Sequence, residues 1–493
     1  MTQFVKQTLS GVGKRSESRL VSGWLLVFGS RFADGRELRR MAAKHVAVVG
    51  AGIAGLGAAW RLAQHGFRVS LFEREQRPGG RARPAMRKNF TIERAGAIVS
   101  AADRDLLRWI GELELPEILP PRPVVSALVH RDRVQVIDSR GVLGIARIPG
   151  IRIHEALRLL RLPRLVARYG NRIDPERPER AASLDDRSLA DFGRLYFGAR
   201  VVERWMAPLI TRTSLADARD ASRVLFLHQY RDGAGDRLGL LRSSSQELMD
   251  RAASSVPASL GACVTRVESR NGGGVRFNFR DGQRERPSEA DAIVLAVPAP
   301  EAVELAATEF SLAERDALEK VRYMPGISLA VALRRPFHAH PHQIQFPHRE
   351  GWPLESVLLE PGVEGGRVPE GRGLALLRAT GSWSAAYFEA PDETVGKELI
   401  DALSGSFPRI RGAGLFAEVL REKRSVPRFD VGRYREIADF TRIQADWRRR
   451  GRRIYFAGDY LMGPGWNAAL RSGYRAAADV EEDLGPTART AAA

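Results

Sequence analysis

The segment His45-Val-Ala-Val-Val49-Gly50-Ala-Gly52-Ile-Ala-Gly55 contains the most informative pattern of this chain. Its first five residues form a short apolar run rich in valine, which is typical of a buried parallel strand. Three glycines follow at the spacing Gly-x-Gly-x-x-Gly, and a helical pattern then runs from Leu56 to His65. A second apolar run, Phe67 to Phe72, ends at Glu73. Strand, glycine triplet, helix and second strand in this order predict a Rossmann-like dinucleotide-binding unit.

The residues of this unit have separate physical roles. Gly50 permits a tight turn, Gly52 lets the backbone approach a pyrophosphate, and Gly55 lets the helix pack closely on the strand. The helix N-terminus offers free N–H groups and the positive end of its dipole to the phosphates. Glu73 can accept hydrogen bonds from an adenosine ribose, and its charge disfavours the 2′-phosphate of NADP. We therefore predict a bound dinucleotide other than NADP.

A second glycine-rich segment, Arg74 to Arg83, follows Glu73 directly. It contains the pair Gly79-Gly80 and then Arg81. The segment comes just past the ribose acid, where the rest of an extended cofactor is expected, and Arg81 could neutralise the pyrophosphate. The alternative interpretation is an ordinary glycine turn with solvated arginines.

With these motifs the chain resembles the flavin superfamily that contains amine oxidases, protoporphyrinogen oxidases and phytoene-type desaturases. Four later segments are similar to those of its members: Phe90 to Gly96, Ala262 to Val267, Asp291 to Pro298, and Ile454 to Asp459. The resemblance implies that the dinucleotide is FAD. It also implies that the FAD site includes Arg74, Gly80, Gly96, Val264, Ala296 and Gly458.

The C-terminal part supplies the flavin end of the predicted site. The segment from Ile454 is expected to be a buried strand that turns into Gly458-Asp459, and a helix is expected from Trp466 to about Leu484. Asp459 can bond the ribityl hydroxyls. The helix start near Asn467 can direct its dipole toward the flavin edge that becomes negative on reduction. We expect non-covalent FAD, because relatives with covalent flavin use a cysteine in this region and the single cysteine is Cys263.

The fold class that these patterns predict is α/β, with an α+β substrate part. A discontinuous Rossmann-like FAD-binding domain would comprise residues 44–100, 235–300 and 425–485. A helical insertion is expected over 101–234, and a mixed sheet that forms the substrate domain over 301–424. Residues 1–43 are interpreted as a disordered or mis-assigned extension, and 486–493 as a tail.

The helical insertion has basic amphipathic stretches. Ile151 to Tyr169 has apolar residues at helical spacing with arginines interleaved, and Pro163 is expected to kink or end a helix there. Such a stretch could lie on a membrane surface, and a solvated helix face is the alternative. No stretch is long and apolar enough to span a bilayer, so we expect a cytoplasmic protein with peripheral contact at most.

Composition excludes several other partners. The net charge of +18 comes mostly from arginine, but the chain has no nucleic-acid-binding motif. A histidine cluster, His338, His340, His342 and His348, could suggest a metal, yet no carboxylate or cysteine joins it at ligand spacing and Pro341 and Pro347 favour a loop. We therefore predict neither nucleic acid nor metal.

The flavin would do the difficult step, so no catalytic residue is assigned. We expect hydride removal from an apolar small molecule, with oxygen or a quinone as electron acceptor. Protoporphyrinogen-oxidase-like order is the nearest resemblance, although Arg242-Ser243-Ser244 stands where that family has paired glycines. A lipid or isoprenoid desaturase is the alternative. Many amine oxidases of this superfamily place a lysine beside the flavin on a strand of the substrate sheet. No lysine lies between Lys320 and Lys397, so an amine oxidase is less favoured. A non-enzymatic prenyl-protein escort module is the last alternative.

Overall fold

The computed structural model describes residues 43–485, apart from 95–97, 116, 120, 139–140, 234–236, 338–340 and 348–351. Several sequence predictions concern residues outside this description. They are those for the N-terminal extension up to residue 42, the C-terminal tail, Gly96, His338, His340 and His348. The described residues from Lys44 onward form one compact unit.

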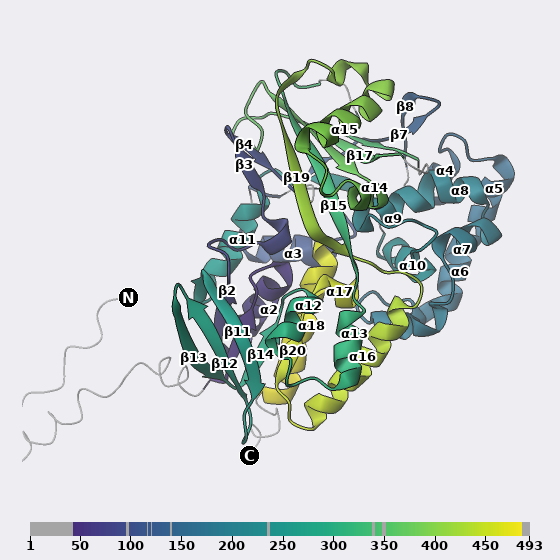
Figure 1. Cartoon of the computed structure of the whole chain (residues 1–493). Helices are drawn as coiled ribbons and strands as arrows, with labels where there is room; N and C mark the ends of the chain where they lie inside the picture. The colour runs from purple at the N-terminus through teal and green to yellow at the C-terminus, as the bar shows by residue number, and fades with distance from the viewer. Residues whose placement is uncertain are drawn as a thin grey trace, which may run out of the picture. The chain divides into compact units, whose positions relative to one another are not determined.

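A five-stranded parallel sheet carries the glycine triplet (Figure 1). Its strand order is β10-β2-β1-β14-β20. The strands are β1 (His45–Val49), β2 (Arg68–Glu73), β10 (Ala258–Leu260), β14 (Ala292–Leu295) and β20 (Ile454–Phe456). Strands from three distant parts of the sequence thus pair side by side, and the predicted α/β fold class is confirmed.

Two helices from opposite ends of the chain pack together beside this sheet. They are α2 (Ile53–Gln64) and α18 (Trp466–Leu484). A Cβ atom added to Gly473 of α18 would lie 2.1 Å from the carbonyl oxygen of Ala54 in α2. Small residues at this crossing let the two backbones approach closely, which brings the N-terminal and C-terminal motifs to one place.

A second, seven-stranded mixed sheet has the order β19-β15-β18-β17-β16-β7-β8. Its strands are β7 (Ser126–His130), β8 (Arg133–Val136), β15 (Tyr323–Leu333), β16 (Gln343–Gln345), β17 (Leu354–Pro361), β18 (Gly373–Ala379) and β19 (Gly414–Pro427). Strands β15 to β19 lie within or overlap residues 301–424, for which the sequence predicted a mixed substrate-domain sheet. The observed sheet also takes in β7 and β8, a hairpin within the segment that the sequence predicted to be helical, because β7 pairs in parallel with β16.

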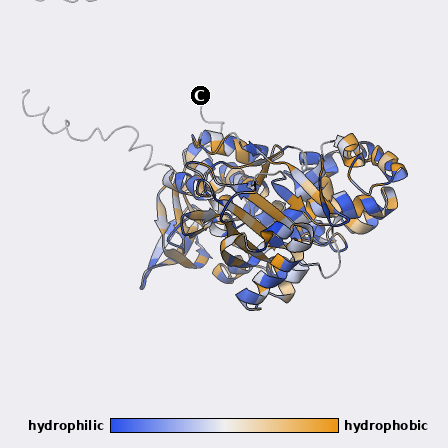
Figure 2. Ribbon diagram, turned by 90° about the horizontal axis from the view of Figure 1, so that it is seen from above, coloured by the Kyte–Doolittle hydropathy of each residue, from blue (hydrophilic) through white to orange (hydrophobic). Residues whose placement is uncertain are grey.

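Helices dominate the rest of that insertion (Figure 1). They are α3 (Arg104–Glu112), α4 (Gly141–Ala146), α5 (Ile153–Leu159), α6 (Arg161–Tyr169), α7 (Leu189–Tyr196), α8 (Ala199–Val201), α9 (Ala207–Ser214) and α10 (Arg223–Asp232). The break between α5 and α6 falls at Leu160, and Pro163 lies in the first turn of α6, where its missing N–H costs no helical hydrogen bond. These helices mix hydrophilic and hydrophobic residues along their length (Figure 2).

In the described part of the chain, the remaining elements are three smaller sheets and seven further α-helices. The sheets are β11 (Ala262–Ser269) with β12 (Val275–Asp281) and β13 (Arg284–Ala290), β3 (Ala85–Arg87) with β4 (Phe90–Ile92), and β5 (Ile98–Ser100) with β9 (Leu238–Leu240) and β6 (Arg122–Pro123). The helices are α11 (Ser245–Ser254), α12 (Ala299–Leu305), α13 (Leu312–Glu319), α14 (Gly381–Ala386), α15 (Asp392–Ser406), α16 (Arg433–Arg449) and α17 (Asp459–Met462).

Candidate functional site

A cavity of about 880 Å³ extends from the glycine triplet of the parallel sheet to the inner face of the seven-stranded sheet. The residues that the sequence predicted for the cofactor and that line this cavity are Gly50, Gly52, Glu73, Arg74, Gly80, Arg81, Val264, Ala296, Gly458, Asp459 and Asn467. Of the other two, Gly55 lies behind the loop and Gly96 is outside the described residues. One cavity therefore collects motifs separated by more than four hundred positions.

The triplet forms a loop that is tight on one side and open on the other. Gly50 has a φ of +101°, and an added Cβ would lie 2.6 Å from the carbonyl oxygen of Ala296. A Cβ on Gly55 would lie 1.8 Å from the carbonyl oxygen of Gly50, so a side chain there has no room. A Cβ on Gly52 would meet no atom within 4 Å. The open side faces the start of α2, which has no side-chain cap, and it fits a pyrophosphate on free N–H groups.

Glu73 connects the end of β2 to this loop. Its buried carboxylate accepts hydrogen bonds from the backbone N–H of Ala51 (2.6 Å) and of Glu75 (3.0 Å). An ionised carboxylate offers about four acceptor positions, so two remain for hydroxyl donors in the cavity. Glu73 thus fixes the loop and keeps the acceptor capacity expected of a ribose-binding acid.

Arg81 and Asp459 form an ion pair in the middle of the cavity wall. Arg81 Nη2 donates to Asp459 Oδ1 at 2.8 Å, and Arg81 Nη1 donates to the carbonyl oxygen of Ser425 at 3.1 Å. Burial acts to lower the pKa of Arg81, but the carboxylate of Asp459 outweighs burial and raises it. The sequence interpretation gave the two side chains separate contacts with the cofactor and did not foresee that they bind each other.

The start of α18 faces the same cavity. Trp466 and Asn467 open the helix as the sequence predicted, and no side chain caps it. Asn467 Oδ1 accepts a hydrogen bond from the backbone N–H of Leu106 at 2.9 Å, which ties the helix start to α3. Gly458 is held by a bond from its N–H to Ser472 Oγ (2.9 Å). Free N–H groups and the positive dipole end at this position fit a flavin edge that gains negative charge.

The part of the cavity next to the seven-stranded sheet is apolar with a few polar groups. Its apolar wall includes Ile327, Leu358, Leu376 and Leu420. Its polar groups include Asp103, Arg212, Gln229, Gln343 and Arg378. Sequence analysis singled out none of these polar residues, because each stands alone in its segment without a motif around it.

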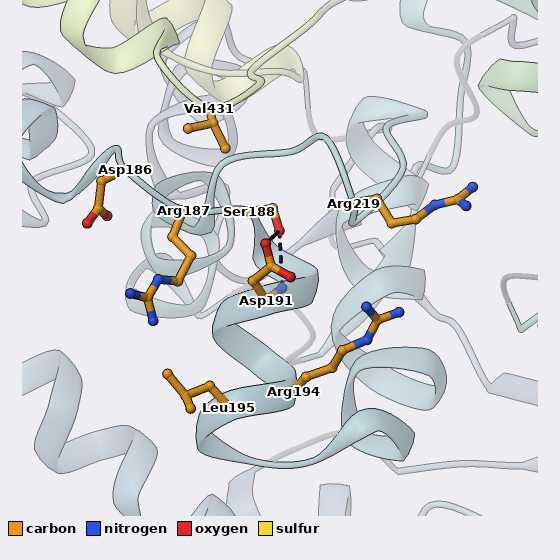
Figure 3. Close-up of a pocket in the computed structure, with 8 residues that line it drawn as sticks. All are labelled: Asp186, Arg187, Ser188, Asp191, Arg194, Leu195, Arg219 and Val431. Carbon is orange, nitrogen blue, oxygen red and sulfur yellow. Dashed lines mark hydrogen bonds between the residues drawn. The ribbon is translucent and has the colours of Figure 1, made fainter.

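A second, shallow pocket lies on the helical insertion around the start of α7 (Figure 3). Ser188 donates a hydrogen bond to the Asp191 carboxylate (2.9 Å) and accepts one from the Asp191 backbone N–H (3.1 Å). Both bonds belong to an ordinary helix cap, so this pocket offers no reactive pair. Among the described residues, no group of histidine, cysteine, aspartate or glutamate has the geometry of a metal site. None of the helices in the described part of the chain combines the length and the apolar character needed to cross a membrane.

The protein family described as flavin containing amine oxidoreductase matches residues 53–481. A protein of Mycobacterium tuberculosis named as a flavin-containing monoamine oxidase is 29% identical over 271 residues, covering 51% of this chain and 56% of that protein. Protoporphyrinogen oxidase 2 of Arabidopsis thaliana is 25% identical over 182 residues, covering 37% of this chain and 34% of that protein. The chain thus spans about half or less of the length of these curated relatives.

Solved structures share the fold over most of the chain. Wild-type putrescine oxidase bound to putrescine has a TM-score of 0.70 at 19% identity, covering 89% of this chain and 99% of that one. Cyclohexylamine oxidase from Brevibacterium oxydans has a TM-score of 0.67 at 18% identity, covering 90% of this chain and 100% of that one. At these identities the similarity establishes the fold alone.

Proposed function

Since the chain belongs to the flavin-containing amine oxidoreductases, and is thus an FAD-dependent oxidoreductase, we propose that it removes hydride from a hydrophobic small molecule, in a protoporphyrinogen-oxidase-like reaction. The observation that carries this proposal is the single cavity that joins the glycine triplet to the apolar wall of the seven-stranded sheet. A cofactor along the triplet and a substrate on that wall would lie in contact. The FAD, when bound, accepts the hydride.

The chain's own residues would bind and orient the cofactor. Gly52 and the start of α2 would hold the pyrophosphate, and Glu73 the adenosine ribose. Asp459, held by Arg81, would bond the ribityl hydroxyls. The start of α18 would stabilise negative charge at the flavin edge. Side chains on β15, β17 and β18 would position the substrate and exclude water from the reacting bond.

Two other oxidations fit the same family. A lipid or isoprenoid desaturase is supported by the apolar wall and by relatives named as phytoene desaturases. An amine oxidase is supported by the relative named as a monoamine oxidase. Of the described residues that line the cavity, the only lysine is the exposed Lys423 on β19. Because Lys423 is exposed, it does not supply the buried lysine that would lie beside the flavin in an amine oxidase.

We propose that the FAD is bound non-covalently. The single cysteine, Cys263, lies on β11 beside Val264, at the end of the cavity predicted for adenine. It is therefore far along the cofactor from the reacting ring. Oxygen or a quinone would take up the electrons afterwards. Acid precipitation should release the flavin into the supernatant, and colour that stays with the pellet would contradict this attachment.

We also propose peripheral contact with the cytoplasmic face of a membrane. The outer face of α5 exposes Ile153 (82%) and Leu157 (62%), and Leu160 follows at the next turn. Exposed arginines border this face, at Arg158, Arg161, Arg164 and Arg168. An exposed apolar face bordered by arginines has the chemistry that binds an anionic lipid surface.

The reaction is tested by anaerobic titration of the purified yellow protein. Protoporphyrinogen, a phytoene-type polyene and primary amines are added separately, and bleaching of the flavin absorbance is recorded. We expect bleaching with a hydrophobic donor and none with a small hydrophilic amine. Bleaching by small amines alone would favour amine oxidation, and no bleaching by any reducing donor would contradict the proposed function.

A further inference from the structure

Two arginines meet at the substrate end of the cavity. Arg212 comes from the last turn of α9, and Arg378 from β18. Arg378 Nη1 donates a hydrogen bond to the backbone carbonyl oxygen of Arg212 at 2.9 Å. Both residues line the cavity together with the apolar wall of the seven-stranded sheet. Helical insertion and sheet thus bring two guanidinium-bearing residues together beside the space for substrate.

Arg212 has no partner for its side chain among the described residues. Its guanidinium donates no hydrogen bond and forms no ion pair within the described part of the chain, and its Nε is buried without a partner. Arg378, by contrast, has the carbonyl oxygen of Arg212 and the carboxylate of Glu355 at 3.9 Å. A guanidinium has five N–H donors, and a buried one is ordinarily hydrogen-bonded. The Nε atom is closed off from the cavity, but the two Nη groups are not among the buried atoms, and their donors are therefore available to a molecule in the cavity.

The described charged residues near Arg212 do not form a hydrogen bond or an ion pair with its guanidinium group. Burial lowers the pKa of Arg212, and repulsion from Arg378 adds to that effect. The carboxylates of Asp103 and Glu355 attract Arg212 but form no ion pair with it. Asp103 instead accepts a hydrogen bond from the Ser100 N–H at 2.7 Å, and burial raises its pKa. An additional anion beside Arg212 would thus be stabilised.

We propose that Arg212 binds a carboxylate of the substrate, so that the substrate is an amphipathic organic acid. Its apolar part would contact Ile327, Leu358 and Leu376. The planar fork of the guanidinium matches the two oxygens of a carboxylate. A doubly charged phosphate fits less well, because the carboxylates of Asp103 and Glu355 already act electrostatically on Arg212 and would repel the second negative charge. This inference rests on the proposed function and adds an anionic group to the hydrophobic substrate.

The test measures binding to the FAD-loaded protein by isothermal titration calorimetry, after its flavin content has been determined. The probes share one alkyl chain: decanoate, 1-decanol, decylamine and decyl phosphate. We expect decanoate to bind at least 10-fold more tightly than each of the others. Arg212→Gln should weaken decanoate binding by about 10- to 100-fold and leave decanol binding unchanged, since a charged hydrogen bond is lost. Arg212→Lys should keep part of the affinity.

Two further variants separate this site from other arginines. Arg409→Gln changes an exposed arginine on the surface and should leave decanoate binding unchanged. Arg94→Gln removes another cavity arginine whose Nε is buried without a partner, and it should weaken binding less than Arg212→Gln does. Decanol or decyl phosphate binding as tightly as decanoate would overturn the inference even without a variant. A loss of decanoate binding in Arg94→Gln but not in Arg212→Gln would overturn it as well. A protein that takes up no flavin would instead contradict the proposed function.

Discussion

Arg81 and Asp459, 378 positions apart in the sequence, form a hydrogen-bonded ion pair at 2.8 Å in the wall of the cavity. Arg81 follows the Gly79-Gly80 pair after β2, and Asp459 follows the last strand of the parallel sheet. The pair therefore joins the segment predicted for the pyrophosphate to the segment predicted for the ribityl chain. It fixes the distance between them before any cofactor binds.

We predict that Arg81→Gln and Asp459→Asn are coupled in their effect on folding. Each variant leaves the other side chain with an uncompensated charge in a largely buried position. In urea unfolding of the FAD-free protein, the double variant should be about 1 to 2 kcal/mol more stable than the sum of the single effects implies. Additive effects would show that the pair does not stabilise the site.

Gly52→Ala should remove FAD binding without harming the fold. The backbone of Gly52, with φ −76° and ψ 176°, is open to any residue, and the added methyl group would meet no protein atom within 4 Å. It would occupy the space proposed for the pyrophosphate. We expect a loss of bound flavin in the purified protein, while the free energy of unfolding of the FAD-free protein changes by less than about 1 kcal/mol.

Two other glycines serve as controls for this change. Gly405→Ala adds a methyl group to open space in α15 and should keep full flavin content. Gly55→Ala would place Cβ 1.8 Å from the carbonyl oxygen of Gly50 and should destabilise the FAD-free protein by about 1 to 3 kcal/mol. Normal flavin content in Gly52→Ala would contradict the placement of the pyrophosphate.

Acid should destabilise the protein through His228. Burial lowers the pKa of His228 to about 3, and neither ring nitrogen has a partner among the described residues. The unfolded chain takes up this proton near its ordinary pKa, while the folded chain does not. The stabilising contribution of neutral His228 to the free energy of unfolding should therefore be fully present above about pH 6.5 and fall by about 1.4 kcal/mol per pH unit below it, until the folded pKa is reached.

Urea midpoints of the wild type and of His228→Leu between neutral and acid pH check this dependence. The variant has no proton to take up at this position, so its stability should fall less steeply with pH. Parallel curves for the two proteins would show that His228 does not contribute.

Liposome flotation tests the membrane contact. Ile153→Glu with Leu157→Glu places two charges on the exposed apolar face of α5 and should abolish flotation with anionic vesicles. The matched control is Leu312→Glu, because Leu312 is 88% exposed but lies on α13, outside the helical insertion. Flotation that is equal for wild type and double variant would contradict the proposed contact.

The elements with strong local signals could be predicted from the sequence. β1 spans the predicted His45–Val49, and α18 begins at the predicted Trp466. Both could be predicted because a valine run and a glycine-rich helix start are recognisable from the local sequence alone. The resemblance to the flavin superfamily, the α/β fold class and FAD as cofactor are confirmed. The roles of individual residues toward FAD stay predictions.

The features that depend on distant pairing could not be predicted. β7 and β8 stand in a segment with many helical patterns, and they become strands through the contact of β7 with β16. The ion pair of Arg81 with Asp459 depends on the packing of chain ends, which no local pattern contains. Arg212 was indistinguishable from the many surface arginines of this basic chain until the fold placed it in the cavity.

The flavin content of the purified protein is the decisive measurement for FAD binding by this cavity. Acid extraction and chromatography identify the released flavin, and its absorbance near ~450 nm gives the amount for each chain. We expect one molecule of FAD per chain in the wild type and its loss in Gly52→Ala. A folded, colourless protein that takes up no FAD on reconstitution would contradict this expectation.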